Sequence, residues 1–182
     1  VIDCNAEIYT DRRSLWRDFK RSETFKFEIA KCDRNSWKRF SKYHYLSHRL
    51  AGGHNETFGI YFDGKQIGFQ CFSNYVPHRK GTQKIMHSNR TVIHPDYVGF
   101  GIGMKLIDLT SEIMLKDGFR VMAKFSSIPV YKSMSRNPKW RLSEASNNTS
   151  KAQYAPSGSM KRKAGMRQAT RTFSFNYVGD AS

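Results

Sequence analysis

Three glycines at alternate positions separate a strand-like run from a helical pattern in this chain. They are Gly99, Gly101 and Gly103, within "HPDYVGFGIG" at residues 94–103. Glycine adopts positive φ and lets a neighbouring group approach the backbone closely, so these positions favour a sharp strand-to-helix corner. The helix N-terminus that follows offers unpaired N–H groups and the positive end of its dipole. The corner therefore predicts an anion site, with a tight turn and close helix packing as the alternative.

Two better-known phosphate motifs do not fit this corner. The dinucleotide fingerprint G-x-G-x-x-G needs a glycine at position 104, where this chain has Met104. A P-loop needs Gly-Lys-Ser/Thr, but Met104 also follows the last glycine of the cluster. Any anion bound here must therefore be held by another arrangement of backbone amides.

The rest of the chain alternates strand and helix patterns. Residues 102–116 place apolar side chains at helical spacing, with Ile102, Leu106, Leu109 and Ile113 on one stripe, and Gly118 ends this helix. We expect strands at residues 25–32, 84–93, 119–125 and 170–178, a hairpin over 55–72, short helices after Asp33, and a short helix over 128–137. This order predicts an α/β fold with a mixed sheet, in which the strand–helix–strand unit around residue 102 is parallel and right-handed.

Charge suggests an anionic partner. The net charge is +16, and no acidic residue occurs from Lys65 to Pro95 or from Ala145 to Gly179. A solvated surface explains one such stretch, but two favour a phosphorylated cofactor or nucleic acid.

The cysteines and the first residue give expectations about the cellular compartment and about how the chain is divided into segments. Cys4, Cys32 and Cys71 are far apart and odd in number, which favours a reducing cytoplasm over a disulfide framework or zinc ribbon. No apolar run is long enough to span a membrane.

The chain begins with Val1 rather than methionine, so we expect a piece of a longer product. We expect a lead-in segment at 1–24 and one domain at 25–182, with a basic Ser/Lys-rich excursion at about 144–170.

The segment "TVIHPDYVGFGIGMKLID" resembles the signature of the GNAT acyltransferase superfamily. In that family a strand ends at a hydrophobic–Pro turn and runs into Arg/Gln-x-x-Gly-x-Gly/Ala and a long helix. The looser resemblance covers residues 25–143. It implies a mixed, centrally splayed β-sheet flanked by helices, of the acyl-CoA N-acyltransferase type, and acetyl-CoA as a small-molecule acyl donor and co-substrate.

The resemblance also implies which residues hold the donor. The strand end pairs with the pantetheine arm and the corner amides grip the diphosphate, at Val92, Ile93, His94, Val98, Gly99, Phe100, Gly101, Ile102, Gly103 and Met104. Val98 replaces the family's Arg or Gln, which removes a side-chain contact but no backbone N–H. We expect Arg79, Lys80 or Lys84 to compensate.

Amide formation needs a base for the acceptor ammonium and an acid for the thiolate. His87 is the expected base, because it lies eleven residues before Val98, where histone-type family members carry a glutamate; His94 and Asp96 are alternatives. Tyr131 is the expected acid, although "SSIPVYKSMSRN" departs from the family pattern there.

Tyr43, His44 and Tyr45 are expected to shape the substrate pocket. His44 and His48 are four residues apart, but Tyr45 stands where a metalloprotease helix has glutamate, so we expect no metal.

Three functions remain open from the sequence. The first is an N-acetyltransferase that moves an acetyl group to an amine by direct transfer in a ternary complex. The second is a nucleic-acid-binding module with the same fold, and the third an acyltransferase that modifies tRNA, DNA or a nucleic-acid-bound protein. The sequence does not identify the acceptor, which loops select in this fold.

Overall fold

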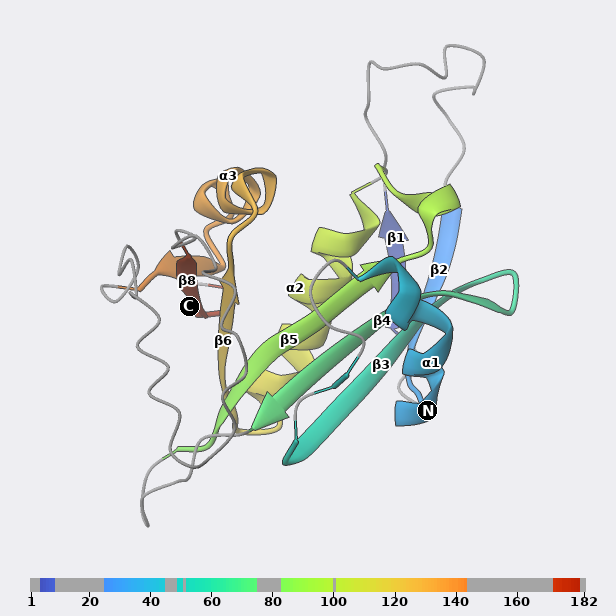
Figure 1. Cartoon of the computed structure of the whole chain (residues 1–182). Coiled ribbons are helices and arrows are strands. Elements are labelled where there is room, and N and C mark those ends of the chain that lie inside the picture. The colour runs from blue at the N-terminus through green and yellow to red at the C-terminus, as the bar shows by residue number, and fades with distance from the viewer. Residues whose placement is uncertain are drawn as a thin grey trace, which may run out of the picture. The chain divides into compact units, whose positions relative to one another are not determined.

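The computed structural model describes residues 4–8, 25–44, 49–50, 52–74, 83–99, 101–143 and 172–180 (Figure 1). The chain divides into two compact units, Val1–Met122 and Ala123–Ser182. The excursion expected at about 144–170 lies outside the described residues, as do Tyr45 and Phe100.

The first unit contains strands β1 (Cys4–Ile8), β2 (Phe25–Lys31), β3 (His54–Phe62), β4 (Lys65–Asn74) and β5 (Ile85–Ile93), short helices η1 (Arg34–Ser36), α1 (Trp37–Phe40), η2 (Ser41–Tyr43) and η3 (Pro95–Tyr97), and the long helix α2 (Ile102–Lys116). Strand β6 (Arg120–Phe125) runs from the first unit into the second. The second unit continues with α3 (Ile128–Arg136), β7 (Trp140–Leu142) and β8 (Phe173–Tyr177).

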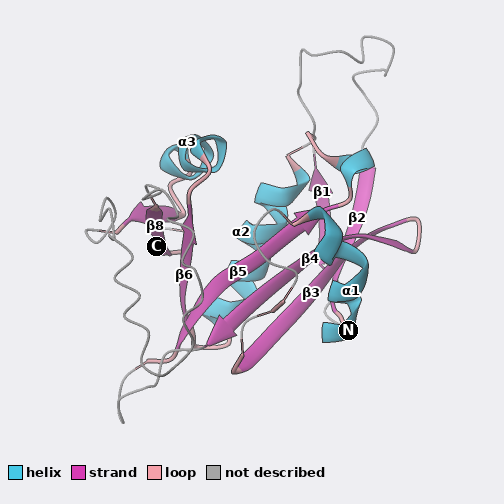
Figure 2. Ribbon diagram, viewed as in Figure 1, coloured by secondary structure: helices cyan, strands magenta, loops and turns pink. Residues whose placement is uncertain are grey.

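Strands β1 to β5 are neighbours in chain order, and each adjacent pair is antiparallel (Figure 2). The predicted hairpin is confirmed, with Asp63 (φ 47°) and Gly64 (φ 70°) in the turn between β3 and β4. The amide of Arg120 donates to the Lys84 carbonyl at 2.9 Å, so β5 and β6 start side by side. Neighbouring strands that start together run parallel. The expected mixed α/β sheet is therefore confirmed.

The two faces of this sheet carry different helices. Trp37 and Phe40 of α1 pack on one face, with ring centroids 5.4 and 6.3 Å from that of Phe69. Gly68 points to the other face, where a β-carbon would lie 2.6 Å from the Ile93 side chain. That face carries α2, which lies behind β5 in the view of Figure 1.

The buried stripe of α2 differs from the predicted one. Ile102 and Leu106 are buried as expected, but Leu109 and Ile113 are only half-buried. Thr110, Ser111 and Met114 are fully buried in their place. Two of these buried residues are small and polar, so an apolar pattern alone misses them.

The second unit has its own aromatic core. Strands β7 and β8 pair antiparallel, with Trp140 opposite Tyr177 and their rings 4.9 Å apart. Phe125, at the end of β6, stacks on Phe175 at 5.8 Å.

Strands β1 and β7 were not predicted. The first lies in the expected lead-in segment, and the second is three residues long. Such short strands depend on a partner strand that the local sequence does not reveal.

Candidate active site

The glycine corner has the backbone that its sequence requires. Gly101 is the N-cap of α2 with φ 77° and ψ −1°, and Gly99 has φ 104°. Residues other than glycine are strained in this left-handed region of backbone conformation. A β-carbon added at Gly101 would meet nothing within 4 Å. The corner therefore turns sharply and leaves open space beside its backbone.

The first amides of α2 are suited to an anion. The Met104 and Lys105 amides both donate to the Gly101 carbonyl, at 3.1 and 3.2 Å. No backbone carbonyl of the described residues accepts from the amides of Ile102 or Gly103. The N-cap residue Gly101 has no side chain to cap the helix, and the first turn contains no acidic residue. Unpaired amides and the positive end of the helix dipole at this position favour an anion.

Gly103 differs from Gly101, because neither φ nor packing requires glycine there. A β-carbon at Gly103 would lie 3.5 Å from the Ile93 side chain, which is an ordinary van der Waals contact. Val92 is buried and pairs with Phe69 of β4. Val98 is 63% exposed, so a longer side chain fits at this position without displacing any neighbour.

Lys84 cannot compensate for the missing Arg or Gln at Val98. It precedes the first residue of β5, whereas the corner follows the last, and nine residues of strand span about 30 Å. Arg79 and Lys80 lie outside the described residues. Lys105 is the described lysine nearest the corner in sequence, exposed in the first turn of α2.

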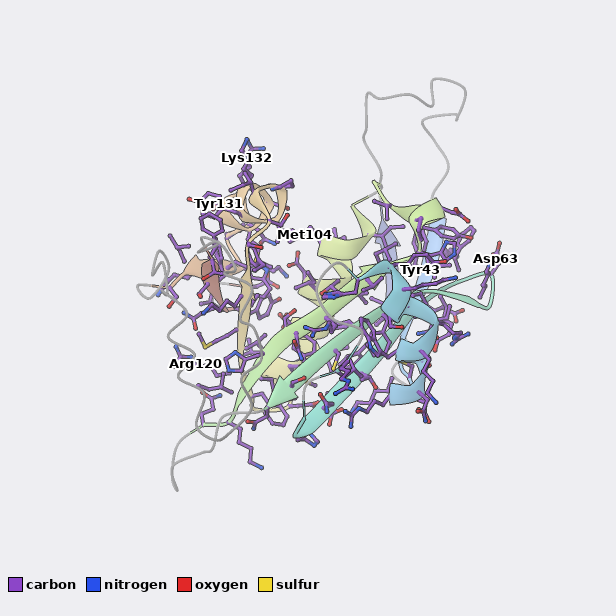
Figure 3. All side chains as sticks on the ribbon, in the orientation of Figure 1. Tyr43, Asp63, Met104, Arg120, Tyr131 and Lys132 are labelled. Atoms are coloured by element: carbon purple, nitrogen blue, oxygen red, sulfur yellow. The ribbon has the colours of Figure 1, made fainter. Side chains whose placement is uncertain are left out.

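A tyrosine, a histidine and an aspartate meet directly before the corner. The Tyr43 hydroxyl lies 3.2 Å from Nε2 of His94, and their rings are 5.1 Å apart in an edge-on arrangement. Nδ1 of His94 lies 3.4 Å from the Asp96 carboxylate and 3.4 Å from the Asp96 amide nitrogen. Figure 3 labels Tyr43, at the end of η2, and Met104, in the first turn of α2. Residues predicted for substrate and for cofactor are thus in direct contact.

His44 packs against α1, with its ring 5.7 Å from that of Trp37. It is half-buried.

A chain of polar side chains crosses β3, β4 and β5 on the α1 side of the sheet. Ser73 is its centre: its hydroxyl donates to Oδ1 of Asn55 at 2.6 Å and accepts from Nδ2 of Asn89 at 3.1 Å. Oδ1 of Asn89 accepts from Nη1 of Arg90 at 2.6 Å. The Cys71 thiol donates to Oδ1 of Asn55 at 3.5 Å. We call Asn55, Ser73, Asn89 and Arg90 the polar chain.

Both ends of the polar chain hold the segment that connects η2 to β3. Nη2 of Arg90 donates to the Arg49 carbonyl at 3.1 Å, and Nδ2 of Asn55 donates to the Gly53 carbonyl at 2.9 Å. The sequence indicated a polar face on β5, but it did not predict this network. Its members become neighbours only when three strands pair in register.

His87 lies on the same face as the polar chain. It is the register partner of Ser73, and its side chain is half-buried with Nε2 out of contact with solvent.

Tyr131 lies in the second unit and packs on aromatic rings. Its ring centroid is 4.3 Å from that of Phe173 and 6.0 Å from that of Phe175.

The two described cysteine side chains are poor nucleophiles. Burial raises the pKa of Cys71, against smaller opposing contributions from Ser73 and nearby arginines. Burial also raises the pKa of Cys32, which the Thr57 hydrogen bond only partly offsets. A raised thiol pKa lowers the thiolate fraction at neutral pH, and the thiolate is the reactive form.

The described residues contain no group of three or more His, Cys, Asp or Glu side chains arranged to hold a metal ion. Among these residues no helix combines the length and the apolarity needed to cross a membrane.

The sequence profile described as "Acetyltransferase (GNAT) family" matches residues 13–135, more than half of the chain. No curated protein is significantly similar to the chain in sequence.

Solved structures share the fold at low sequence identity. The ribosomal-protein-S18-alanine N-acetyltransferase of Escherichia coli superposes with a TM-score of 0.54 at 12% identity, covering 86% of this chain and 96% of that one. A GNAT family acetyltransferase from Elizabethkingia anophelis with acetyl-CoA bound gives 0.51 at 8% identity, covering 83% and 97%. Naa50 of Arabidopsis thaliana, in complex with the bisubstrate analogue CoA-Ac-MVNAL, gives 0.51 at 10% identity, covering 82% and 97%.

Proposed function

Because this chain belongs to the acetyltransferase (GNAT) family, we propose that it moves an acetyl group from acetyl-CoA to an amine acceptor. The observation that carries the proposal is the corner at Gly101, where a β-carbon would meet open space and the amides of Ile102 and Gly103 have no backbone acceptor among the described residues. Two of the solved relatives contain acetyl-CoA or a CoA bisubstrate analogue.

The described residues fit the donor. Amides of Gly99, Gly101, Ile102 and Gly103 would hold the diphosphate, and the end of β5 from Val92 to His94 would border the pantetheine arm. When bound, acetyl-CoA supplies an activated acyl group. A charge-assisted hydrogen bond contributes about 1.5–3 kcal/mol, so a few converging amides suffice without the Arg or Gln that Val98 replaces.

Direct transfer in a ternary complex is favoured over a covalent acyl-enzyme. A ping-pong route needs a nucleophile such as a thiolate. Cys32 and Cys71 have pKa values raised by burial, so neither supplies one readily. In direct transfer the acceptor nitrogen forms the new C–N bond, the C–S bond breaks, the nitrogen loses a proton and the thiolate gains one.

The residues that move these protons are proposals as well. His87 is the proposed base, because imidazole titrates near neutral pH and an alkylammonium pKa is about 10.4. Its Nε2 is out of contact with solvent, so the acceptor amine, or a water ordered with it, must reach that atom. His94, in contact with Tyr43 and Asp96, is the second candidate. Tyr131 is the proposed acid, and Tyr43, His44 and Tyr45 the proposed pocket wall.

Calorimetric titration with acetyl-CoA tests the donor site, with a matched pair of variants. Gly101 and Gly118 stand at opposite ends of α2 with φ of 77° and 83°, and a β-carbon at either meets open space. Gly101→Glu and Gly118→Glu therefore impose similar backbone strain and add the same charge. We expect Gly118→Glu to bind like the wild type and Gly101→Glu to lose binding. A wild-type chain that does not bind acetyl-CoA excludes the proposed function.

The base is tested separately. With a panel of amines as acceptors, release of the CoA thiol by His87→Ala should fall by about 10²–10⁴-fold, the usual contribution of a positioned base. Unchanged turnover would remove His87 from the mechanism and leave the donor site intact.

A further inference from the structure

The segment that follows β2 has a strongly basic composition. Residues 34–55 contain Arg34, Lys38, Arg39, Lys42 and Arg49 but no aspartate or glutamate. Helices η1, α1 and η2 follow one another without a break from residue 34 to residue 43.

These helices present one apolar and one basic face. Trp37 and Phe40 are buried against the sheet. Four cations on the opposite side are all exposed, and we call them the basic ridge: Arg34, Lys38, Arg39 and Lys42. Arg34, Lys38 and Lys42 recur at every fourth residue across the three short helices, and Arg39 follows Lys38.

Three of the four ridge cations have no carboxylate partner in the described part of the chain. The nearest acid in sequence, Asp33, uses its carboxylate to cap the Asn35 amide at 2.5 Å. Within the described part of the chain, Lys38, Arg39 and Lys42 belong to none of the ion pairs. Arg39 donates to the neutral Gln66 side chain, and Lys42 lies 4.9 Å above the Tyr43 ring. The ridge therefore carries a concentrated positive charge.

The ridge ends beside the candidate active site. Lys42 precedes Tyr43, whose hydroxyl contacts His94 directly before the glycine corner. A molecule held along the ridge thus lies next to the expected acceptor side.

We propose that the basic ridge binds the phosphate backbone of a nucleic acid. Phosphate contacts need cations and no apolar anchor, because release of condensed counterions drives the binding. Protein interfaces are instead depleted of lysine and have an apolar centre. The exposed large apolar residues of the described part of the chain are Val98, Ile128, Leu142 and Val178, and none belongs to the ridge.

This surface does not depend on transferase activity, so its test is separate. Fluorescence anisotropy would follow a labelled single-stranded RNA of mixed sequence between 50 and 200 mM salt. The ridge variant is Lys38→Gln/Arg39→Gln/Lys42→Gln. The control variant, Lys26→Gln/Lys65→Gln/Lys116→Gln, removes the same charge from exposed lysines elsewhere in the first unit. Acetyl-CoA titration of both variants reports on the fold and the donor site.

The expected result is a change in salt dependence. Each lost phosphate contact lowers the slope of log K against log salt by about 0.7, so the ridge variant should lose about 2 units and the control almost none. Lys38→Gln alone should lower this slope by about 0.7. This single substitution keeps the test valid if the triple variant does not fold. The same titration with duplex DNA shows whether the basic ridge prefers single-stranded or double-stranded nucleic acid.

Three results would overturn the proposal: no RNA binding by the wild type, equal losses in the ridge and control variants, or equally strong binding of a poly-glutamate peptide of matched charge. If acetyl-CoA binding also fails, the proposed function falls independently of the ridge.

Discussion

Two buried serines allow a direct measurement of what the polar chain contributes to stability. Ser73 and Ser111 both have 0% relative exposure. The Ser73 hydroxyl makes hydrogen bonds of 2.6 and 3.1 Å to Asn55 and Asn89. The Ser111 hydroxyl has no hydrogen-bond partner among the described residues. Serine-to-alanine substitution removes the same atom at both sites, but only at Ser73 does it also remove hydrogen bonds.

The expected effects have opposite signs. Each net hydrogen bond contributes about 0.5–1.5 kcal/mol, so Ser73→Ala should lower the free energy of unfolding by about 2 kcal/mol. Ser111→Ala removes a buried hydroxyl that is not hydrogen-bonded and improves helix propensity, so it should raise that free energy by about 0.5–1 kcal/mol.

Urea titration followed by tryptophan fluorescence measures both free energies of unfolding, with thermal unfolding as a check. A chain of this size shifts Tm by about 2–4 °C per kcal/mol, which predicts a loss of roughly 4–8 °C for Ser73→Ala. Amide exchange in residues 52–55 should also accelerate in Ser73→Ala, because the polar chain holds the Gly53 carbonyl. Equal effects of the two substitutions would refute the assignment of stability to these hydrogen bonds.

Three further outcomes follow from the structure. Gly68→Ala should lower the free energy of unfolding by about 1–3 kcal/mol, because its β-carbon would lie within 3.0 Å of two isoleucine side chains and a backbone carbonyl; Gly52→Ala, with open space, is the neutral control in the same urea titration. Val98→Arg restores the side chain usual in the family and should tighten acetyl-CoA binding in calorimetry by about tenfold or more, the effect of one charge-assisted hydrogen bond; unchanged affinity would show that this side chain does not reach the diphosphate. Burial raises the pKa of Cys32 and Cys71 above 9.0, so the folded state keeps these protons longer than the unfolded state. The stability tied to the neutral thiols is therefore complete below about pH 9 and declines as pH rises further; a flat profile from pH 8 to pH 10 in urea titrations would contradict this.

Local signals in the sequence predicted the features that depend on few residues. Asp33 caps the helical stretch as expected, and Gly101 and Gly118 mark the two ends of α2 with positive φ. The turn at Asp63 and Gly64 fixed the hairpin. In each case one side chain, or the lack of one, restricts the backbone of its immediate neighbours.

Features that depend on distant residues were not predicted. The contact between Tyr43 and His94 joins residues 51 positions apart, and the contact of Ser73 with Asn55 joins residues 18 apart. Neither pair has a local pattern, because strand register and the path of η2 bring the atoms together. Predictions of chemistry at His87 and Tyr131 likewise came from resemblance to a family and stay predictions.

The polar chain also restricts how the strands can align. A slip of two residues between neighbouring strands keeps every side chain on its original face, so apolar alternation does not prevent it. Such a slip would move Ser73 away from Asn55 and Asn89 and bury three polar groups without their hydrogen bonds. Mispaired sheets of this kind are therefore disfavoured, and these side chains help to specify a single alignment of β3, β4 and β5.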